Sequence, residues 1–233
     1  MKRKLILILS VLLLITGALV VVFPHINNII YSKKAEKNIE EFLNLQSASN
    51  SETQKNYHEL YEELQNYNEQ LFLQDSPRLT NKSAYENFSV DLSKYSIKND
   101  LIGYISIPKM KLKLPLFLGA DKTNMAEGIA VMGQTSAPIG GENTNSCLAG
   151  HRGWNGTKKF RYIEKLQKDD KIYITNLWDK LTYKVIDIKI IEKYNADSVK
   201  IIEGKDIVTL LTCHPYGSVG EKRYMVVCQR VEK

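Results

Sequence analysis

The chain has 233 residues, of which 43% are hydrophobic and 25% are charged, and its formal net charge is +6 at pH 7. This length and composition fit one domain of ordinary size with appendages. The positive charge is spread along the chain rather than gathered in blocks, so nothing in the composition points to nucleic acid as a partner.

The N-terminus predicts a membrane anchor. Three basic residues, Lys2 to Lys4, precede an apolar segment from Leu5 to Phe23 that is long enough for a helix to cross a bilayer. The segment runs into Pro24 without the small-residue cleavage site of a signal peptide. We therefore expect residues 1–4 to form a cytoplasmic tail and residues 5–23 an uncleaved transmembrane helix. The basic residues should stay inside, which predicts a single-pass protein of the cell membrane with everything after Pro24 on the extracellular face.

Residues 24–100 are expected to form a helical appendage. Apolar residues recur at helical spacing from Ser32 to Leu45, and again, together with tyrosines, from Tyr57 to Phe72. We expect the tyrosine-lined face to pack against the rest of the protein. The pattern ends at residues 75–80, because proline disfavours helical geometry in the residue before it.

Residues 101–233 have the character of a β-domain. Short segments rich in β-branched or aromatic residues alternate with turn residues, and the one helical candidate is Phe160 to Leu166. About eight strands in some 130 residues predict a mainly β protein with a closed eight-stranded β-barrel and short helices. The predicted strands are Ile102–Ile107, Leu112–Leu118, Gly128–Met132, Ser146–Ala149, Lys171–Thr175, Thr182–Lys193, Ile207–Thr212 and Tyr224–Val231.

Two residues with reactive side chains follow predicted strands. The chain has three cysteines, an odd number that leaves at least one thiol unpaired in an exported protein without a partner chain. Cys213 lies at the end of one strand, and His151 leaves another before a glycine-containing turn. A nearby cation favours the reactive thiolate form of a cysteine. Cys213, His151 and Arg223 could therefore supply a nucleophile, a general acid and base, and a charged donor for an oxyanion.

Other residues near Cys213 are not expected to take part directly in the reaction. His214 is too close to Cys213 in sequence to face it easily from an extended chain, and His58 lies in a helical segment. We expect Thr212, His214 and Tyr216 to line the substrate site. Arg152 follows His151, and a continuing strand would point it away from the site.

The motifs around these residues resemble those of sortases, the membrane-anchored cysteine transpeptidases of Gram-positive bacteria. The resemblance runs from Leu101 to Val231. It rests on Thr-Leu-Leu-Thr-Cys at 209–213, Leu-Ala-Gly-His-Arg-Gly at 148–153 and Lys-Arg-Tyr-Met-Val-Val at 222–227. It implies a sortase-like barrel with Cys213 as nucleophile, His151 as general acid and base, and Arg223 stabilising the oxyanion or substrate.

Further features are most similar to class C sortases, which polymerise pilins. They are Gly-Gly-Glu-Asn at 140–143, Cys-His-Pro-Tyr at 213–216 and the helical appendage. In that class an Asp-Pro-aromatic lid covers the thiol. The segment Asp-Ser-Pro-Arg at 75–78 has an inserted serine and no aromatic residue, so Asp75 and Pro77 are only a possible lid here. The interval from Cys213 to Arg223 is also one residue longer than is usual.

The resemblance implies a reaction and its partners. The enzyme would cleave an LPxTG-like sorting signal of a pilin or surface protein and hold the acyl group as a thioester on Cys213. It would then pass that group to an amine, either a pilin lysine or, as an alternative, a peptidoglycan precursor during anchoring to the cell wall. No cofactor and no metal are expected.

Two other classes of protein are considered. Papain-like and cell-wall thiol hydrolases usually place the cysteine before the histidine in the chain, whereas His151 precedes Cys213 here. A non-enzymatic, membrane-tethered module would need structural zinc bound by Cys147, His151, Cys213 and Cys228, but the sequence has no C-x2-C pair. We expect Cys147 and Cys228 to be core thiols.

Overall fold

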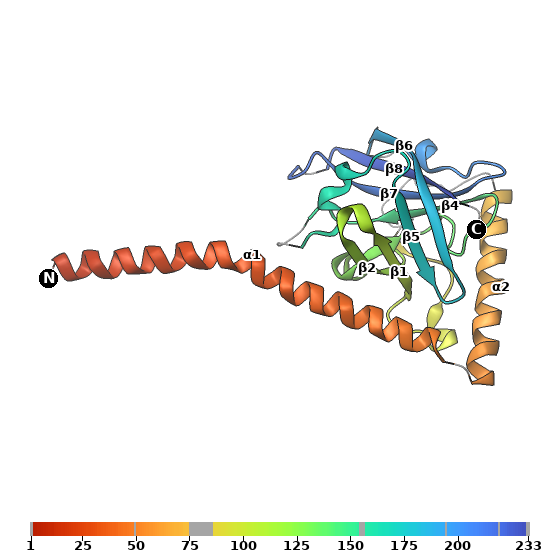
Figure 1. Ribbon diagram of the computed structural model, residues 1–233, viewed down its shortest axis with the longest axis horizontal. Helices are drawn as coiled ribbons and strands as arrows, with labels where there is room; N and C mark the ends of the chain where they lie inside the picture. The colour runs from red at the N-terminus through yellow and green to blue at the C-terminus, as the bar shows by residue number, and fades with distance from the viewer. Residues whose placement is uncertain are drawn as a thin grey trace.

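The computed structural model describes residues 2–48, 50–74, 86–153, 157–193, 195–218 and 220–231. A β-barrel carries two long helices, one of which projects far beyond it towards the N-terminus (Figure 1). The lid residues Asp75 and Pro77 lie outside the described residues, so the possible lid stays a prediction.

Eight strands close into a barrel in the order β1-β2-β3-β4-β7-β8-β6-β5, which confirms the predicted fold class. The pairs β2–β3 and β4–β7 are parallel, and the other neighbouring pairs are antiparallel. The strands are β1 (Leu101–Ile107), β2 (Leu112–Leu118), β3 (Ile129–Val131), β4 (Thr144–Ala149), β5 (Lys171–Asn176), β6 (Lys180–Glu192), β7 (Asp206–His214) and β8 (Lys222–Arg230).

Short helices connect the strands. The predicted helix at 160–166 is present as the 3-10 helix η3 (Lys159–Lys165), and α4 (Lys122–Glu127) was not expected from the sequence. Asp121 caps α4 by accepting hydrogen bonds from the backbone of Thr123 and Asn124. The other 3-10 helices are η1 (Leu92–Tyr95), η2 (Pro108–Met110) and η4 (Ala196–Val199).

The first helix joins the predicted membrane segment to the barrel without a break. Helix α1 (Lys2–Gln46) continues through Pro24, and its 45 residues make it about 68 Å long. Its apolar N-terminal part is exposed and is long and apolar enough to cross a membrane. Its C-terminal part packs on the barrel through Ala35, Ile39 and Phe42, all buried, and Lys34 pairs with Glu127 at 2.7 Å. The segments at 5–23 and 32–45, which we expected as separate elements, are therefore one helix.

Helix α2 (Ser51–Leu73) packs its tyrosine-lined face against the barrel, as the periodicity predicted. Tyr57, Leu60 and Leu64 are buried, and the indole Nε1 of Trp178 donates a hydrogen bond to the backbone oxygen of Tyr57 at 3.1 Å. The N-cap of α2 is Asn50, which accepts from the backbone N–H of Thr53 at 2.7 Å. Helix α2 thereby covers one end of the barrel.

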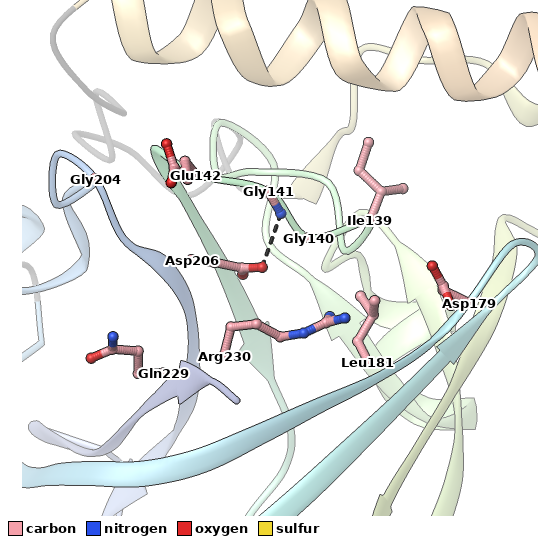
Figure 2. A pocket seen from close by; sticks show the side chains of 10 residues that line it. All are labelled: Ile139, Gly140, Gly141, Glu142, Asp179, Leu181, Gly204, Asp206, Gln229 and Arg230. Atoms are coloured by element: carbon pink, nitrogen blue, oxygen red, sulfur yellow. Dashed lines mark hydrogen bonds between the residues drawn. The ribbon is translucent and has the colours of Figure 1, made fainter. Parts of the chain in front are cut away.

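The two ends of the barrel differ in what they carry. In Figure 1, α2 lies at the end where β7 begins, and the connection from β7 to β8 lies at the end facing the projecting part of α1. At the α2 end a cavity of about 410 Å³ is lined by residues that include Leu181, Asp206 and Arg230 (Figure 2). The residues with candidate chemistry lie at the other end, so this cavity is not part of the candidate active site.

Candidate active site

The pairing of β7 with β8 places Cys213 and Arg223 beside each other. Their α-carbons are cross-strand partners, one step before the end of the ladder at His214 and Lys222. A methyl group built onto Gly220 would lie 2.9 Å from Cys213 Sγ and 3.1 Å from Arg223 Nη1, so the sulfur and the guanidinium lie close to one point in space. The sequence interval of ten residues is therefore closed by a hairpin that brings thiol and cation together.

The guanidinium of Arg223 is held by its own hairpin. Its Nη1 donates to the backbone oxygen of Gly220 at 2.5 Å and to that of Lys222 at 3.1 Å. Gly220 has a φ of 77°, a left-handed conformation that favours glycine. Because the loop carbonyls hold Nη1, the forked guanidinium is fixed beside the sulfur, where it can donate to an oxygen of a bound acyl group.

Two threonines of the Thr-Leu-Leu-Thr-Cys motif join β7 to its parallel neighbour β4. Thr209 Oγ1 donates to Asn145 Oδ1 at 2.9 Å, and Thr212 Oγ1 donates to the backbone oxygen of Gly150 at 2.6 Å. The N–H of Gly150 in turn donates to the backbone oxygen of Leu211 at 3.1 Å. These bonds tie the strand that ends in the thiol to the strand that leads to His151.

The position of His151 also depends on close packing at Gly150. A Cβ at Gly150 would lie 2.6 Å from side-chain carbons of both Ile129 and Phe160, so a larger residue could not bring the chain so close to the core. His151 follows directly, half-buried, and its backbone oxygen accepts from the N–H of Phe160 at 3.1 Å. The histidine therefore leaves the barrel at a fixed place and direction.

Burial and a nearby cation act on the imidazole of His151. Burial lowers the pKa of His151 below its usual range, and the positive charge of Lys159 adds to that effect. Lys159 is itself buried; its Nζ donates to the backbone oxygens of Met125 and Ala126 at 2.6 and 2.8 Å. Burial lowers the pKa of Lys159 to about 8. At neutral pH the imidazole of His151 is mostly neutral and able to accept a proton.

The side chain of Arg152 lies where the sequence did not place it. We expected it to point away from the site, but it is 5% exposed, and its Nη1 donates to the backbone oxygen of Cys213 at 3.2 Å. The same nitrogen is 2.8 Å from His214 Nδ1, and Nη2 pairs with the carboxylate of Glu164. The extended pattern of β4 ends at Ala149, so alternation could not give the direction of a side chain three residues later.

The remaining predicted site residues differ in exposure. Thr212 is 3% exposed and its hydroxyl is engaged by Gly150, so little of it is open to a substrate. His214 is half-buried, and its ring lies tilted against that of Tyr224, with centroids 5.8 Å apart. Tyr216 is 52% exposed, and the guanidinium of Arg161 lies 4.9 Å from its ring centroid. His214 and Tyr216 are thus the two of these residues that lie at the surface of the site.

The other two cysteines are buried in the core. Cys147 and Cys228 are both free thiols with no exposed surface. Burial raises the pKa of Cys147 to about 12 and also raises the pKa of Cys228. Both are therefore held in the unreactive thiol form at neutral pH. Across the part of the chain that the structure describes, no three His, Cys, Asp or Glu side chains group so as to hold a metal, so the geometry gives the zinc module no support.

The comparisons with known proteins agree with this fold. Residues 105–231 match the family model described as the sortase domain, which is more than half of the chain. These residues include nearly the whole eight-stranded barrel, together with Cys213 and Arg223 on its neighbouring strands β7 and β8. The chain belongs to the sortase family.

Individual relatives cover different parts of the chain. It is 29% identical over 131 residues to sortase D of Bacillus subtilis and 34% identical over 134 residues to sortase A of Bacillus anthracis. Each match covers 55% of this chain, and the chain spans 63% and 59% of the length of those two relatives.

Solved structures of class C sortases match more of the chain. Sortase C1 of GBS Pilus Island 1 is 27% identical, with a TM-score of 0.71, covering 85% of this chain and 93% of that one. Sortase C from Clostridium perfringens SM101 is 31% identical, with a TM-score of 0.68, covering 84% and 99%. The likeness extends beyond the residues matched by the family model.

Proposed function

We propose that this protein is a membrane-anchored cysteine transpeptidase that cleaves an LPxTG-like sorting signal and transfers the acyl group to an amine. The observation that carries the proposal is the cross-strand pairing of Cys213 with Arg223, on a strand that is hydrogen-bonded to Gly150, the residue before His151. Membership of the sortase family supports the same chemistry. The other two thiols are buried, which leaves Cys213 as the cysteine that a substrate can reach.

In the first half-reaction the thiolate of Cys213 attacks the scissile carbonyl carbon of the sorting signal. The carbonyl π electrons move to oxygen, and the guanidinium of Arg223 stabilises the resulting oxyanion. Collapse of the tetrahedral intermediate breaks the C–N bond, and His151, having taken the thiol proton, gives it to the leaving amine. The products are a thioester on Cys213 and a released C-terminal fragment with a free amino group.

In the second half-reaction an acceptor amine attacks the thioester carbonyl. His151 takes a proton from the attacking nitrogen and returns it to the departing sulfur, so a new amide forms and the thiol is restored. No cofactor enters either half-reaction, because proton transfer and charge stabilisation are supplied by the three side chains.

The acceptor that we propose is a lysine on a pilin. Support comes from the class C structural relatives, one of which is named for a pilus island, and from their match to the helical appendage as well as the barrel. Anchoring to a peptidoglycan precursor is the alternative. Both acceptors are amines and use the same thioester.

The location that we propose is the cell membrane, with the barrel on the extracellular face. Helix α1 supplies an apolar segment of sufficient length, with Lys2, Arg3 and Lys4 on its inner side. The same helix contacts the barrel through the Lys34–Glu127 ion pair, and the ring of Tyr31 lies 5.1 Å from Lys159 Nζ. A continuous helix would hold the catalytic barrel close to the bilayer.

The test is transfer by the full chain in detergent micelles, mixed with an LPxTG-bearing pilin. A ladder of covalent multimers that survives boiling in detergent is expected, together with a thioester on Cys213 detected by mass spectrometry. Cys213→Ala should abolish both, whereas Cys147→Ala should retain them. Transfer only to small peptidoglycan-like amines would replace pilin polymerisation by wall anchoring, and undiminished turnover by Cys213→Ala would remove the transpeptidase mechanism.

A further inference from the structure

Arg152 provides a buried positive charge next to the nucleophile. Its side chain is 4% exposed, and its guanidinium contacts groups from three parts of the chain: β7, η3 and β8. The Nε–H of Arg152 is buried and has no hydrogen-bond partner among the described residues. Burial of a charged guanidinium costs free energy, so Arg152 is expected to have a role that its contacts explain.

The contacts of Arg152 extend the connection between β4 and β7 beyond the last pair of their hydrogen-bonded ladder. The last pair of the β4–β7 ladder is Ala149 with Leu211. The next links are the Gly150 N–H to the Leu211 oxygen and the Thr212 hydroxyl to the Gly150 oxygen. Arg152 then donates to the oxygen of Cys213 at 3.2 Å. These links reach Leu211, then Thr212 and finally Cys213, and Arg152 makes the last one.

The same guanidinium fixes the residue after the thiol. An arginine can only donate, so His214 Nδ1, 2.8 Å from Arg152 Nη1, must accept and must carry no proton. His214 is therefore the Nε2–H tautomer in this arrangement. The ring of Tyr224 lies under the guanidinium, 5.5 Å from Cζ to the ring centroid, and restricts its movement from the β8 side.

Glu164 orients the arginine from the solvent side. Its carboxylate pairs with Nη2 and lies 3.8 Å from His214 Nδ1, and its side chain is 52% exposed. Glu164 belongs to η3, which follows the His151 loop along the chain. The network thus joins the segment carrying the histidine, the end of the strand carrying the thiol, and a side chain of the strand carrying Arg223.

We propose that Arg152 is a positioning residue for the transpeptidase reaction, which acts by holding the Cys213 backbone and the His214 ring in register with His151 and Arg223. It contacts no reacting atom and works through Cys213 and His214. The inference rests on the proposed function, because it takes Cys213 as the nucleophile. A misplacement of about 1 Å at a reacting group can cost about 100-fold in rate, which sets the size of the expected effect.

The test compares Arg152→Met, Arg152→Lys and a matched control, Lys165→Met, which removes an exposed cation from the same 3-10 helix as Glu164. In the full chain, Arg152→Met should lower kcat about 10- to 100-fold while KM changes less than about threefold, because binding surfaces remain and alignment is lost. Arg152→Lys keeps a positively charged donor, so its kcat should lie between those of Arg152→Met and the wild type. Lys165→Met should match the wild type.

A second readout follows the tautomer of His214 directly. In protein labelled with ¹⁵N-histidine, Nδ1 of His214 should show the shift of an unprotonated acceptor, and Arg152→Met should move it towards the average of two tautomers. A purely structural role would lower the thermal unfolding temperature without this change. If Arg152→Met does not fold, Glu164→Gln removes the charge that orients Arg152 from a half-exposed site and should give a smaller loss of kcat with the same direction of shift.

The outcomes separate the inference from the function. Unchanged kcat in a folded Arg152→Met variant, or a loss confined to KM, would overturn the positioning role while leaving the transpeptidase intact. An unchanged His214 signal would do the same. Full turnover by Cys213→Ala would instead remove the proposed function.

Discussion

The hydroxyl of Thr212 donates a hydrogen bond of 2.6 Å to the backbone oxygen of Gly150, so the residue before Cys213 holds the residue before His151. Both partners are buried, and the bond crosses between the parallel strands β4 and β7 where their ladder ends. The arrangement explains why a hydroxyl residue precedes Cys213 in the motif.

Replacement of Thr212 by valine should therefore weaken both stability and turnover. Valine has the same shape but leaves the Gly150 oxygen without its donor, which costs about 1–3 kcal/mol for a buried group. Urea unfolding would measure the stability, and single-turnover thioester formation would measure alignment. Thr212→Ser keeps the hydroxyl, so its stability and its rate of thioester formation should fall much less than those of Thr212→Val. Equal behaviour of the valine and serine variants would show that the hydroxyl has no such role.

The strands and the order of the motifs could be predicted from the sequence. Short β-branched segments separated by turns predicted eight strands, and their ends placed Cys213 and His151 at strand exits. What sequence could not give is which strands are neighbours. The parallel pairing of β4 with β7 brings together segments some sixty residues apart, and the pairing of Cys213 with Arg223 depends on the register of a hairpin.

The structure differs from the sequence-based expectations where local rules compete with tertiary packing. We expected the apolar segment to end at Phe23 and a separate helical appendage to follow, yet α1 continues through Pro24. Arg152 was assigned an outward direction from strand alternation, but the strand ends three residues earlier and the side chain turns inward to Cys213. At Pro24 the helix runs past the expected boundary, whereas at Arg152 a strand pattern was extended beyond the end of its strand.

Arg223→Lys should lose most of the activity while it keeps its charge. The guanidinium uses Nη1 to bind the oxygens of Gly220 and Lys222, which leaves the rest of its fork to face a substrate oxygen. A lysine ammonium is a point charge and cannot reproduce this geometry. Loss of one oxyanion donor typically costs about 100- to 1000-fold in kcat.

Steady-state kinetics with an LPxTG-type peptide would measure the Arg223→Lys effect. The control is Lys222→Met, which removes the neighbouring exposed cation and its ion pair with Glu192 at 3.5 Å and should leave kcat nearly unchanged. A lysine variant as active as the wild type would mean that only the charge of Arg223 matters.

Lys159→Met should raise the pKa of His151. Burial is the larger cause of the lowered pKa of His151, and the Lys159 cation is the second. Removing the cation removes a repulsion against imidazolium, so the pKa should move towards the ordinary value of about 6.5 while burial still holds it below. NMR titration of the histidine side chains would measure the shift, with His151→Gln to assign the signal.

The exposed neighbour Lys158 gives the control for this titration. Lys158→Met removes one charge of the same sign from the adjacent position, but that side chain lies in solvent, where screening weakens its effect. Only Lys159→Met should change the titration of His151 clearly. A lower or unaltered His151 pKa in Lys159→Met would show that the buried ammonium does not act on the imidazole.

Asp206 at the far end of the barrel should make stability depend on pH in the opposite direction from most carboxylates. It lines the cavity of Figure 2, where its two oxygens accept from the Tyr183 hydroxyl and the Gly141 N–H, each at 2.9 Å. Burial is the largest influence and raises the pKa of Asp206, although these bonds and the nearby Arg230 act the other way. The folded state therefore binds the carboxyl proton more tightly than the unfolded chain.

The sign of the effect follows from this difference between the two states. The stability contributed by the raised pKa is fully present below the unfolded value of about 3.9 and is lost as pH rises through the higher folded value. Asp206→Asn cannot titrate and keeps the acceptor for Tyr183. Urea unfolding of both proteins from pH 4 to pH 8 should therefore show the wild type losing stability relative to Asp206→Asn as pH increases. Other titrating groups cancel in the comparison because both proteins contain them. If the wild type instead becomes more stable relative to Asp206→Asn as pH increases, Arg230 and the hydrogen bonds outweigh burial at Asp206.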